Sequence, residues 1–228
     1  MTIYRSALIN RRPGLTEAEF RDHWIRIHGG LAAKLPGLGT YRQNHILERI
    51  HEAADAPVQS IDGISQLSFD SIAAMEVSDA SPEYALVKAD IRLFQAGITI
   101  LVLQSDELLA DASGARLPAK LLWLSGRRQG IQAEGLRQRW LQAHRQAGLE
   151  IPGARRFVQN FVVDRGHAVQ AGVPAGDPSA VETLSELWFE DEAALRAALH
   201  TQAAQALIHS NPLLAPIAVY RIEEIHIV

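Results

Sequence analysis

Histidine, tyrosine and carboxylate side chains are the main groups in this chain that could carry out chemistry, because its 228 residues include no cysteine. The composition therefore excludes disulfides, thiolate catalysis and cysteine-based metal sites. His28 is the first catalytic candidate, since an imidazole with an ordinary pKa of about 6.5 can move protons at neutral pH. On an α-helix it lies roughly 80° round from Phe20, at the edge of the buried face, where it can reach a cavity. The alternative is a structural histidine that bonds to backbone groups near a helix end.

A second group of candidates shares one face of a predicted strand. Tyr41, Gln43 and His45 alternate along the chain, so the two-residue period of a strand places them on the same side. We interpret Tyr41 and His45 as catalytic partners of His28, and Gln43 as a substrate-binding residue. The alternative is a solvated face or a hydrogen-bonded pair in the core.

No cofactor or metal is expected at these residues. His23 and His28 lie five positions apart, which is about 140° around an α-helix, so they should not share one metal ion. The chain contains no metal-ligand spacing, dinucleotide fingerprint, phosphate loop or nucleophile elbow. A small molecule is therefore the expected ligand, and the expected chemistry is that of amino-acid side chains alone.

The two halves of the chain repeat, and the repeat shows which elements must position these residues. Three residues of the first half, Arg21, Trp24 and His28, recur 116 positions later as Arg137, Trp140 and His144. We therefore expect one domain at 1–108, a linker at 109–118 within the polar stretch 104–118, and a second domain at 119–228.

The copies differ where chemistry is expected. Tyr41 and His45 become Phe157 and Phe161 in the second half. His144 matches His28, but the residues that follow it are Arg-Gln-Ala in place of Gly-Gly-Leu. The first half has Gln66 where the second half has Glu186, a carboxylate that could orient an imidazole or act as a base. We expect one composite or one degraded site. The substrate-binding candidates beside Gln43 are Trp24, which is also a core residue, Gln66, Glu186 and His144.

Each half has the pattern of a ferredoxin-like β-α-β-β-α-β unit. Thr16 and Glu19 form a predicted capping box at the start of the first helix. In the first half the remaining elements are expected to be strands at Ile3–Ile9, Gly39–Leu47, Ile61–Phe69 and Ile98–Leu103, a loop at His51–Ser60 and a helical region at Ser71–Phe94 that breaks near Ser78–Pro82.

Apolar residues in two predicted strands do not alternate with polar ones. Residues 121–124 and 98–103 are almost continuously apolar, which indicates burial on both faces of the sheet. Helices can cover only one face of each ferredoxin-like sheet. We therefore expect an α+β fold in which the two sheets pack on each other as an intramolecular pseudo-dimeric barrel, with a cavity between them.

Several segments of the first half resemble those of a known protein family. The segment from Arg12 to His28, Leu35-Pro-Gly-Leu38 and Tyr41-Arg-Gln-Asn-His45 resemble the EthD family of dimeric α+β barrel proteins, and Asp90 and Phe94 resemble its late helix. The resemblance covers nearly all of both halves. It implies a barrel that the family usually builds from two chains, and it implies that the helix histidine is the usual catalytic candidate. Family members differ in chemistry, so the resemblance does not name a reaction.

Charge and hydropathy restrict the classes of partner and the compartment that we expect for this protein. The net charge is −4, the isoelectric point is near 6.1 and basic residues do not cluster, so a nucleic-acid partner is not expected. The apolar stretches are too short to cross a membrane and the first residues do not resemble a signal peptide, so a cytoplasmic protein is expected. The free sheet edges leave room for a homodimer.

Two functions remain in competition, with a purely structural subunit as a third. The first is cofactor-independent acid–base chemistry on a small apolar or aromatic oxygenated compound, by isomerisation, dehydration or oxygenation. The second is a non-catalytic binding or accessory protein that uses the same cavity.

Overall fold

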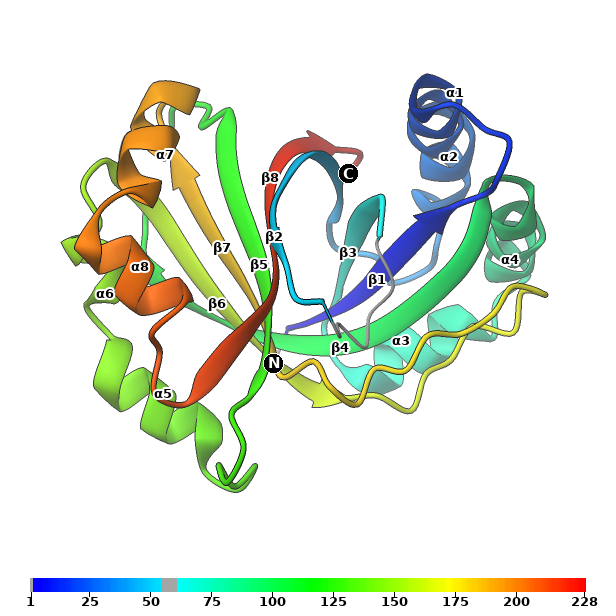
Figure 1. Ribbon diagram of the computed structural model, residues 1–228. Helices are drawn as coiled ribbons and strands as arrows, with labels where there is room; N and C mark the ends of the chain where they lie inside the picture. Colours follow the sequence, from blue (N-terminus) through cyan, green and yellow to red (C-terminus); the bar gives the residue numbers. More distant parts are fainter. Residues whose placement is uncertain (1, 55–60) are drawn as a thin grey trace.

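The computed structural model describes residues 2–54 and 61–228 (Figure 1). The first half contains β1 (Ile3–Arg11), α1 (Glu17–Asp22), the π-helical turn η1 (His23–His28), α2 (Gly29–Ala32), β2 (Tyr41–Glu52), β3 (Gly63–Phe69), α3 (Ile72–Asp79), α4 (Pro82–Phe94) and β4 (Gln95–Leu109). The second half contains β5 (Ala119–Arg127), α5 (Leu136–His144), α6 (Ala147–Glu150), β6 (Ala154–Asp164), β7 (Thr183–Phe189), α7 (Glu192–Leu199), α8 (Gln202–Ile208) and β8 (Leu214–His226).

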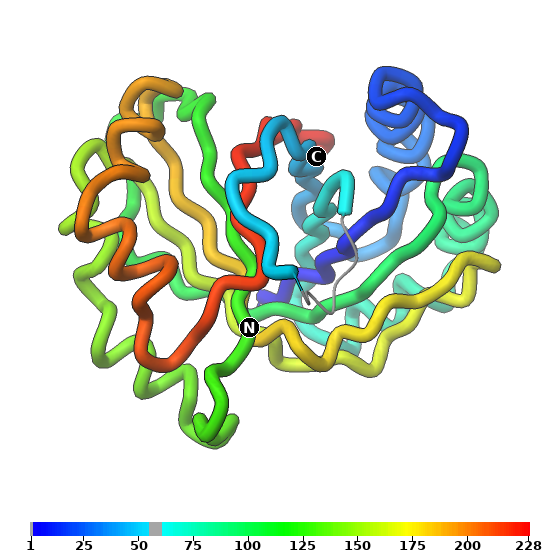
Figure 2. The backbone as a smooth tube through the Cα atoms, viewed as in Figure 1, coloured from blue at the N-terminus to red at the C-terminus, as the bar shows by residue number. Residues whose placement is uncertain are grey.

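The strands of both halves close into one barrel in the order β1-β3-β2-β8-β5-β7-β6-β4. Each half contributes four neighbouring strands, and the antiparallel pairs β2–β8 and β4–β6 join the halves edge to edge. The helices of the first half cover one flank of the barrel and those of the second half cover the other (Figures 1 and 2). The predicted pseudo-dimeric α+β barrel of two ferredoxin-like repeats is confirmed.

The last strand of each half is longer than its apolar segment and takes part in both sheets. β4 pairs with β1 as far as Leu103 and with β6 from Val102 onward. Residues 104–109 therefore belong to a strand, and their interpretation as part of a linker was wrong. The polar side chains there misled the prediction because this end of the strand is only partly buried.

The segment between β2 and β3 also differs in part from the prediction. β2 continues to Glu52, so the first two residues of the expected loop at His51–Ser60 are strand. Residues 55–60 of that loop lie outside the described residues. β3 begins at Gly63, two residues later than expected. The predicted break in the following helical region is confirmed, because the Ser81 hydroxyl caps α4 and Pro82 starts it.

Burial on both faces of the strands is confirmed in β4 and β5. Leu121 and Trp123 of β5 pack against the helices of the second half, whereas Leu122 and Leu124 point into the barrel. In β4, Leu101 contacts the same barrel interior, where apolar residues of both halves form one cluster. No helix among the described residues has the length and apolar character needed to cross a membrane.

Candidate functional site

The helix that carries His28 changes from α to π geometry after Asp22, and His28 is the last residue of the π-helical turn. α1 begins with the predicted capping box, in which Thr16 and Glu19 exchange side-chain and backbone hydrogen bonds. In the π-helical turn η1 the backbone N–H of Gly29 donates to the carbonyl of Trp24, five residues earlier. Residues five apart therefore lie one turn above each other.

The π-helical turn brings His23 and His28 to one carboxylate. His23 Nε2 lies 2.9 Å from Asp90 Oδ1, and His28 Nδ1 lies 2.8 Å from Asp90 Oδ2. The expectation that the two imidazoles face about 140° apart was wrong, because it assumed an α-helix. Asp90 comes from α4, and sequence reasoning noted it only as part of the family resemblance, without a role in the site.

Burial and hydrogen bonding set the protonation states of this cluster. Burial lowers the pKa of His28 below its ordinary value, against the opposing effect of the Asp90 carboxylate. Burial alone would raise the pKa of Asp90, but its hydrogen bonds with His28 and His23 hold that pKa below the ordinary value. His28 is therefore neutral at neutral pH, with Nδ1–H donating to an ionised Asp90 and the lone pair on Nε2.

The second group of candidates forms a hydrogen-bonded chain on the side of β2 that faces the helices. Trp24 Nε1 and Gln43 Nε2 both donate to the Tyr41 hydroxyl, over 3.0 Å and 2.9 Å. Gln43 Nε2 also donates to the carbonyl of Trp24 over 2.8 Å. Both amide protons of Gln43 are thus used, and its Oε1 accepts from His45 Nε2 over 3.1 Å.

The hydrogen-bonded chain determines the tautomer of His45 and the state of Tyr41. Because His45 donates from Nε2, its Nδ1 carries the lone pair, and this buried atom has no hydrogen-bond partner among the described residues. Burial, with the positive charge of Arg21, lowers the pKa of His45 to about 3. Burial also raises the pKa of Tyr41, so its hydroxyl stays protonated.

His45 lines a cavity of about 260 Å³ between the first helix and β2. Its wall is strongly charged and includes Arg11, Phe20, Arg21, Arg49 and Asp62. The sequence predicted a cavity between the two sheets, whereas the cavity that His45 lines lies on the helix-facing side of β2. That side points outward to the helices, because the inward positions of β2 are the alternate ones, Arg42 and Asn44.

The barrel interior instead brings together the other two strand candidates. Gln66 Nε2 donates to Glu186 Oε1 over 2.9 Å, across the two halves. Glu186 also forms an ion pair with Lys120, which is 1% exposed and which sequence reasoning missed. Lys120 Nζ donates further to Glu224 and, over 2.8 Å, to Asn44. Lys120 stands in an otherwise almost continuously apolar strand. This isolated charge could have indicated that its ammonium group has a buried partner.

Opposite charges also set the state of Glu186. Its burial would raise the pKa of the carboxyl, but Lys120 and Arg42 hold that pKa below the ordinary value. The interior therefore contains an ionised cluster in which Lys120 and Arg42 face the carboxylates of Glu186 and Glu224. In the part of the chain that the structure describes, no group of three or more histidine and carboxylate side chains is placed to hold a metal ion.

The second half lacks the acid–base features of the first. His144 Nδ1 donates to the carbonyl of Trp140 and its Nε2 accepts from Asn211, both over 3.1 Å. An amide thus stands where His28 meets a carboxylate, and Phe157 and Phe161 fill the core beside Trp140. His144 is not brought together with His28, His45 or Glu186.

Comparison with known proteins supports this architecture. Residues 12–96 match the family model described as the EthD domain. No curated protein matches the chain.

Solved structures similar to this chain cover almost all of it. An anthrone oxidase-like protein, 12% identical, has a TM-score of 0.61 and covers 99% of this chain and 93% of its own. A protein from Lactobacillus acidophilus NCFM provisionally named a monooxygenase, 10% identical, has a TM-score of 0.56 and covers 100% of this chain and 94% of its own. A mutant chlorite dismutase from Candidatus Nitrospira defluvii, 10% identical, has a TM-score of 0.50, with 97% and 91% covered. At these identities the likeness shows the fold alone.

Proposed function

We propose, from the match of residues 12–96 to the EthD domain, that the protein is a cofactor-independent acid–base enzyme acting on a small oxygenated apolar or aromatic compound. Its site lies between the helices and the sheet of the first half. The observation that carries the proposal is the buried hydrogen bond of 2.8 Å between His28 Nδ1 and Asp90 Oδ2.

His28 is proposed as the general base. Asp90 holds Nδ1–H, which leaves Nε2 to accept a proton from a carbon next to a carbonyl group. The C–H bond breaks, its electron pair moves to the carbonyl oxygen as an enolate, and the ionised Asp90 stabilises the imidazolium. Return of the proton to another carbon gives an isomer, and its transfer to a departing hydroxyl gives water and a dehydrated product.

Tyr41 and His45 are proposed to position the oxygen atoms of the substrate. The Tyr41 oxygen already accepts two hydrogen bonds, so its own proton is available for a carbonyl oxygen. His45 lines the cavity, and its buried Nδ1, which has no partner among residues 2–54 and 61–228, is proposed to accept from a substrate hydroxyl. Gln43 and Trp24 hold both groups in place.

Anthrone is a suitable test substrate, because one protein with a similar fold is named anthrone oxidase-like. With dioxygen it gives anthraquinone and water: the methylene carbon loses two hydrogens and gains one oxygen atom, and the second oxygen atom leaves as water. The rise of anthraquinone absorbance in air is measured above the rate without protein. A panel of lactones and hydroxy ketones, followed by mass spectrometry and NMR, tests isomerisation and dehydration.

His28→Gln is expected to lower turnover by about 10²-fold or more. Asp90→Asn should lower turnover and shift the acid limb of the pH–rate profile to lower pH, because the carboxylate no longer raises the pKa of His28. His200→Gln, at an exposed histidine of the second half, is the matched control. Unchanged turnover in His28→Gln would remove His28 from the mechanism. Saturable binding without turnover across the panel would favour the non-catalytic binding protein.

A further inference from the structure

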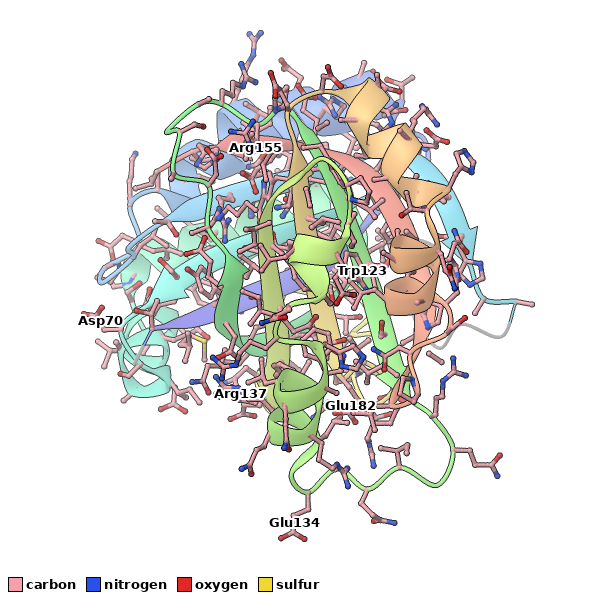
Figure 3. The ribbon with its side chains drawn as sticks, turned by 90° about the vertical axis from the view of Figure 1, so that its left-hand side faces the viewer. Asp70, Trp123, Glu134, Arg137, Arg155 and Glu182 are labelled. Atoms are coloured by element: carbon pink, nitrogen blue, oxygen red, sulfur yellow. The ribbon has the colours of Figure 1, made fainter. Side chains whose placement is uncertain are left out.

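A second and larger cavity opens at the end of the barrel where β5 and β6 begin. Its volume is about 490 Å³, within the range of small-molecule sites. Arg155, which marks this end in Figure 3, lies far from Glu134 and Glu182 at the other end of that face. The lining includes Arg116, Leu117, Pro118, Arg156, Trp188 and Glu224.

A rigid and charged floor underlies this cavity. Glu224 reaches it from β8 and is bonded from below by the buried Lys120. Lys120 Nζ donates hydrogen bonds to Asn44 and Glu224 and forms an ion pair with Glu186. Lys120 also lies over the ring of Trp188, at 4.3 Å from its centroid. The floor is thus held in one geometry before any ligand arrives.

The carboxylates that line the cavity are already engaged. Glu224 accepts from Lys120 and from His226. Glu223 is paired with Arg21, and Asp111 is paired with Arg155. Because each of these carboxylates already has a partner, they are not available to pair with a cationic ligand.

The arginines that line the cavity, in contrast, have donors to spare. Arg156 donates Nε–H to Glu107 over 2.6 Å, and among the described residues its two terminal nitrogens have no acceptor. Arg116 is exposed and forms no hydrogen bond or ion pair within residues 2–54 and 61–228. Unused guanidinium donors match a carboxylate, which can accept two hydrogen bonds from one guanidinium.

The rest of the wall suits a flat apolar body. The Arg156 guanidinium lies 4.6 Å from the centroid of the Trp188 ring. Leu117 and Pro118 line the cavity beside it. We propose that this cavity binds a small aromatic carboxylate, with its carboxylate on Arg156 and Arg116 and its ring against Leu117, Pro118 and the edge of Trp188. The site belongs to the fused barrel as a whole, because Glu224, Arg156 and the 111–118 segment close it together.

Titration calorimetry with 2-naphthoate and its neutral carboxamide tests the proposal. Naphthoate is expected to bind at one site per chain, and the carboxamide about tenfold more weakly, because it cannot make the charge-assisted bonds. Arg156→Gln should weaken naphthoate binding about tenfold. Arg145→Gln, at an exposed arginine outside the cavity, should leave it unchanged. Anthrone turnover is measured separately, so the two proposals can fail independently.

Three results would overturn the proposal. These are no binding of naphthoate, equal affinity for naphthoate and naphthamide, and unchanged affinity in Arg156→Gln protein with a normal unfolding transition. If Arg156→Gln does not fold, Arg116→Gln applies the same test at an exposed position, with a smaller expected loss of about threefold.

Discussion

Replacement of Lys120 by methionine tests whether the charged cluster in the barrel interior has the pairing described. Lys120 is 1% exposed, and its ammonium group forms ion pairs with the carboxylates of Glu186 and Glu224. It also donates a hydrogen bond to the amide oxygen of Asn44. Methionine keeps much of the volume but leaves the fully buried carboxylate of Glu186 without its ion-pair partner, so that only the more distant charge of Arg42 still favours its ionised form. Removing one partner of a buried ion pair costs about 3–5 kcal/mol in the free energy of unfolding.

The loss can be measured by urea and thermal unfolding followed by circular dichroism. For a chain of 228 residues the expected decrease in Tm is about 6–20 °C. The exposed Lys34→Met is the control, and its unfolding free energy should change by less than about 0.5 kcal/mol. A loss below about 1 kcal/mol for Lys120→Met would refute the reasoning, because the carboxylates would then be solvated or otherwise paired.

The pH dependence gives a second test with a definite sign. In the wild type the pKa of Glu186 lies below its ordinary value, so its contribution to stability is complete at neutral pH and is lost as the pH falls. Without Lys120 burial dominates and raises that pKa, so the variant loses stability as the pH rises. The difference between wild type and Lys120→Met should therefore shrink from about pH 7.5 to about pH 5. A difference that grows on acidification would contradict this account.

A double variant separates the ion pair from simple loss of packing. In Lys120→Met with Glu186→Gln, the amide oxygen of the new glutamine can still accept from Gln66 and Asn160. No buried charge then remains at position 186. We expect the double variant to recover at least about 1 kcal/mol relative to Lys120→Met alone, measured as a double-mutant cycle.

Two further predictions concern the first half. A Cβ atom at Gly63 would lie 2.3 Å from Cζ3 of the buried Trp24, so Gly63→Ala should cost about 1–3 kcal/mol in chemical unfolding. Gly30→Ala, where a Cβ meets open space on a helix, should be neutral or stabilising by up to about 1 kcal/mol, and equal effects at both glycines would contradict the packing. His45, with a pKa of about 3, should show a neutral Nε2–H tautomer at about pH 5 in ¹⁵N NMR. Arg21→Gln should raise that pKa, because the guanidinium opposes protonation.

Several parts of the fold were predictable from local patterns. The capping box of Thr16 and Glu19 forms as expected, since both partners lie within one turn. The break before Pro82 follows from its ring and from the Ser81 cap. The continuous apolar run at 121–124 reflects a strand with helices on one side and the barrel interior on the other. In each case the determining residues are neighbours in the chain.

The candidate site residues were named from the sequence and their roles stay predictions, whereas their contacts could not be predicted. Tyr41, Gln43 and His45 form one hydrogen-bonded chain with Trp24, whereas His28 bonds to Asp90 and not to that chain. Asp90, the partner of His28, was not assigned to the site, because a carboxylate in a later helix gives no local signal of what it contacts. The π-helical turn was also missed, and without it His23 and His28 would not meet one carboxylate.

The sequence by itself determined that the chain is a duplication of one β-α-β-β-α-β unit, because self-similarity and periodicity are properties of the chain alone. It also showed that the copies diverge at Tyr41 and His45, which are phenylalanines in the second half. Only the tertiary structure decided which strand face looks into the barrel, and that Lys120 pairs with Glu186. These outcomes depend on barrel closure and strand register, which bring together residues far apart in sequence through the summed energy of many weak contacts.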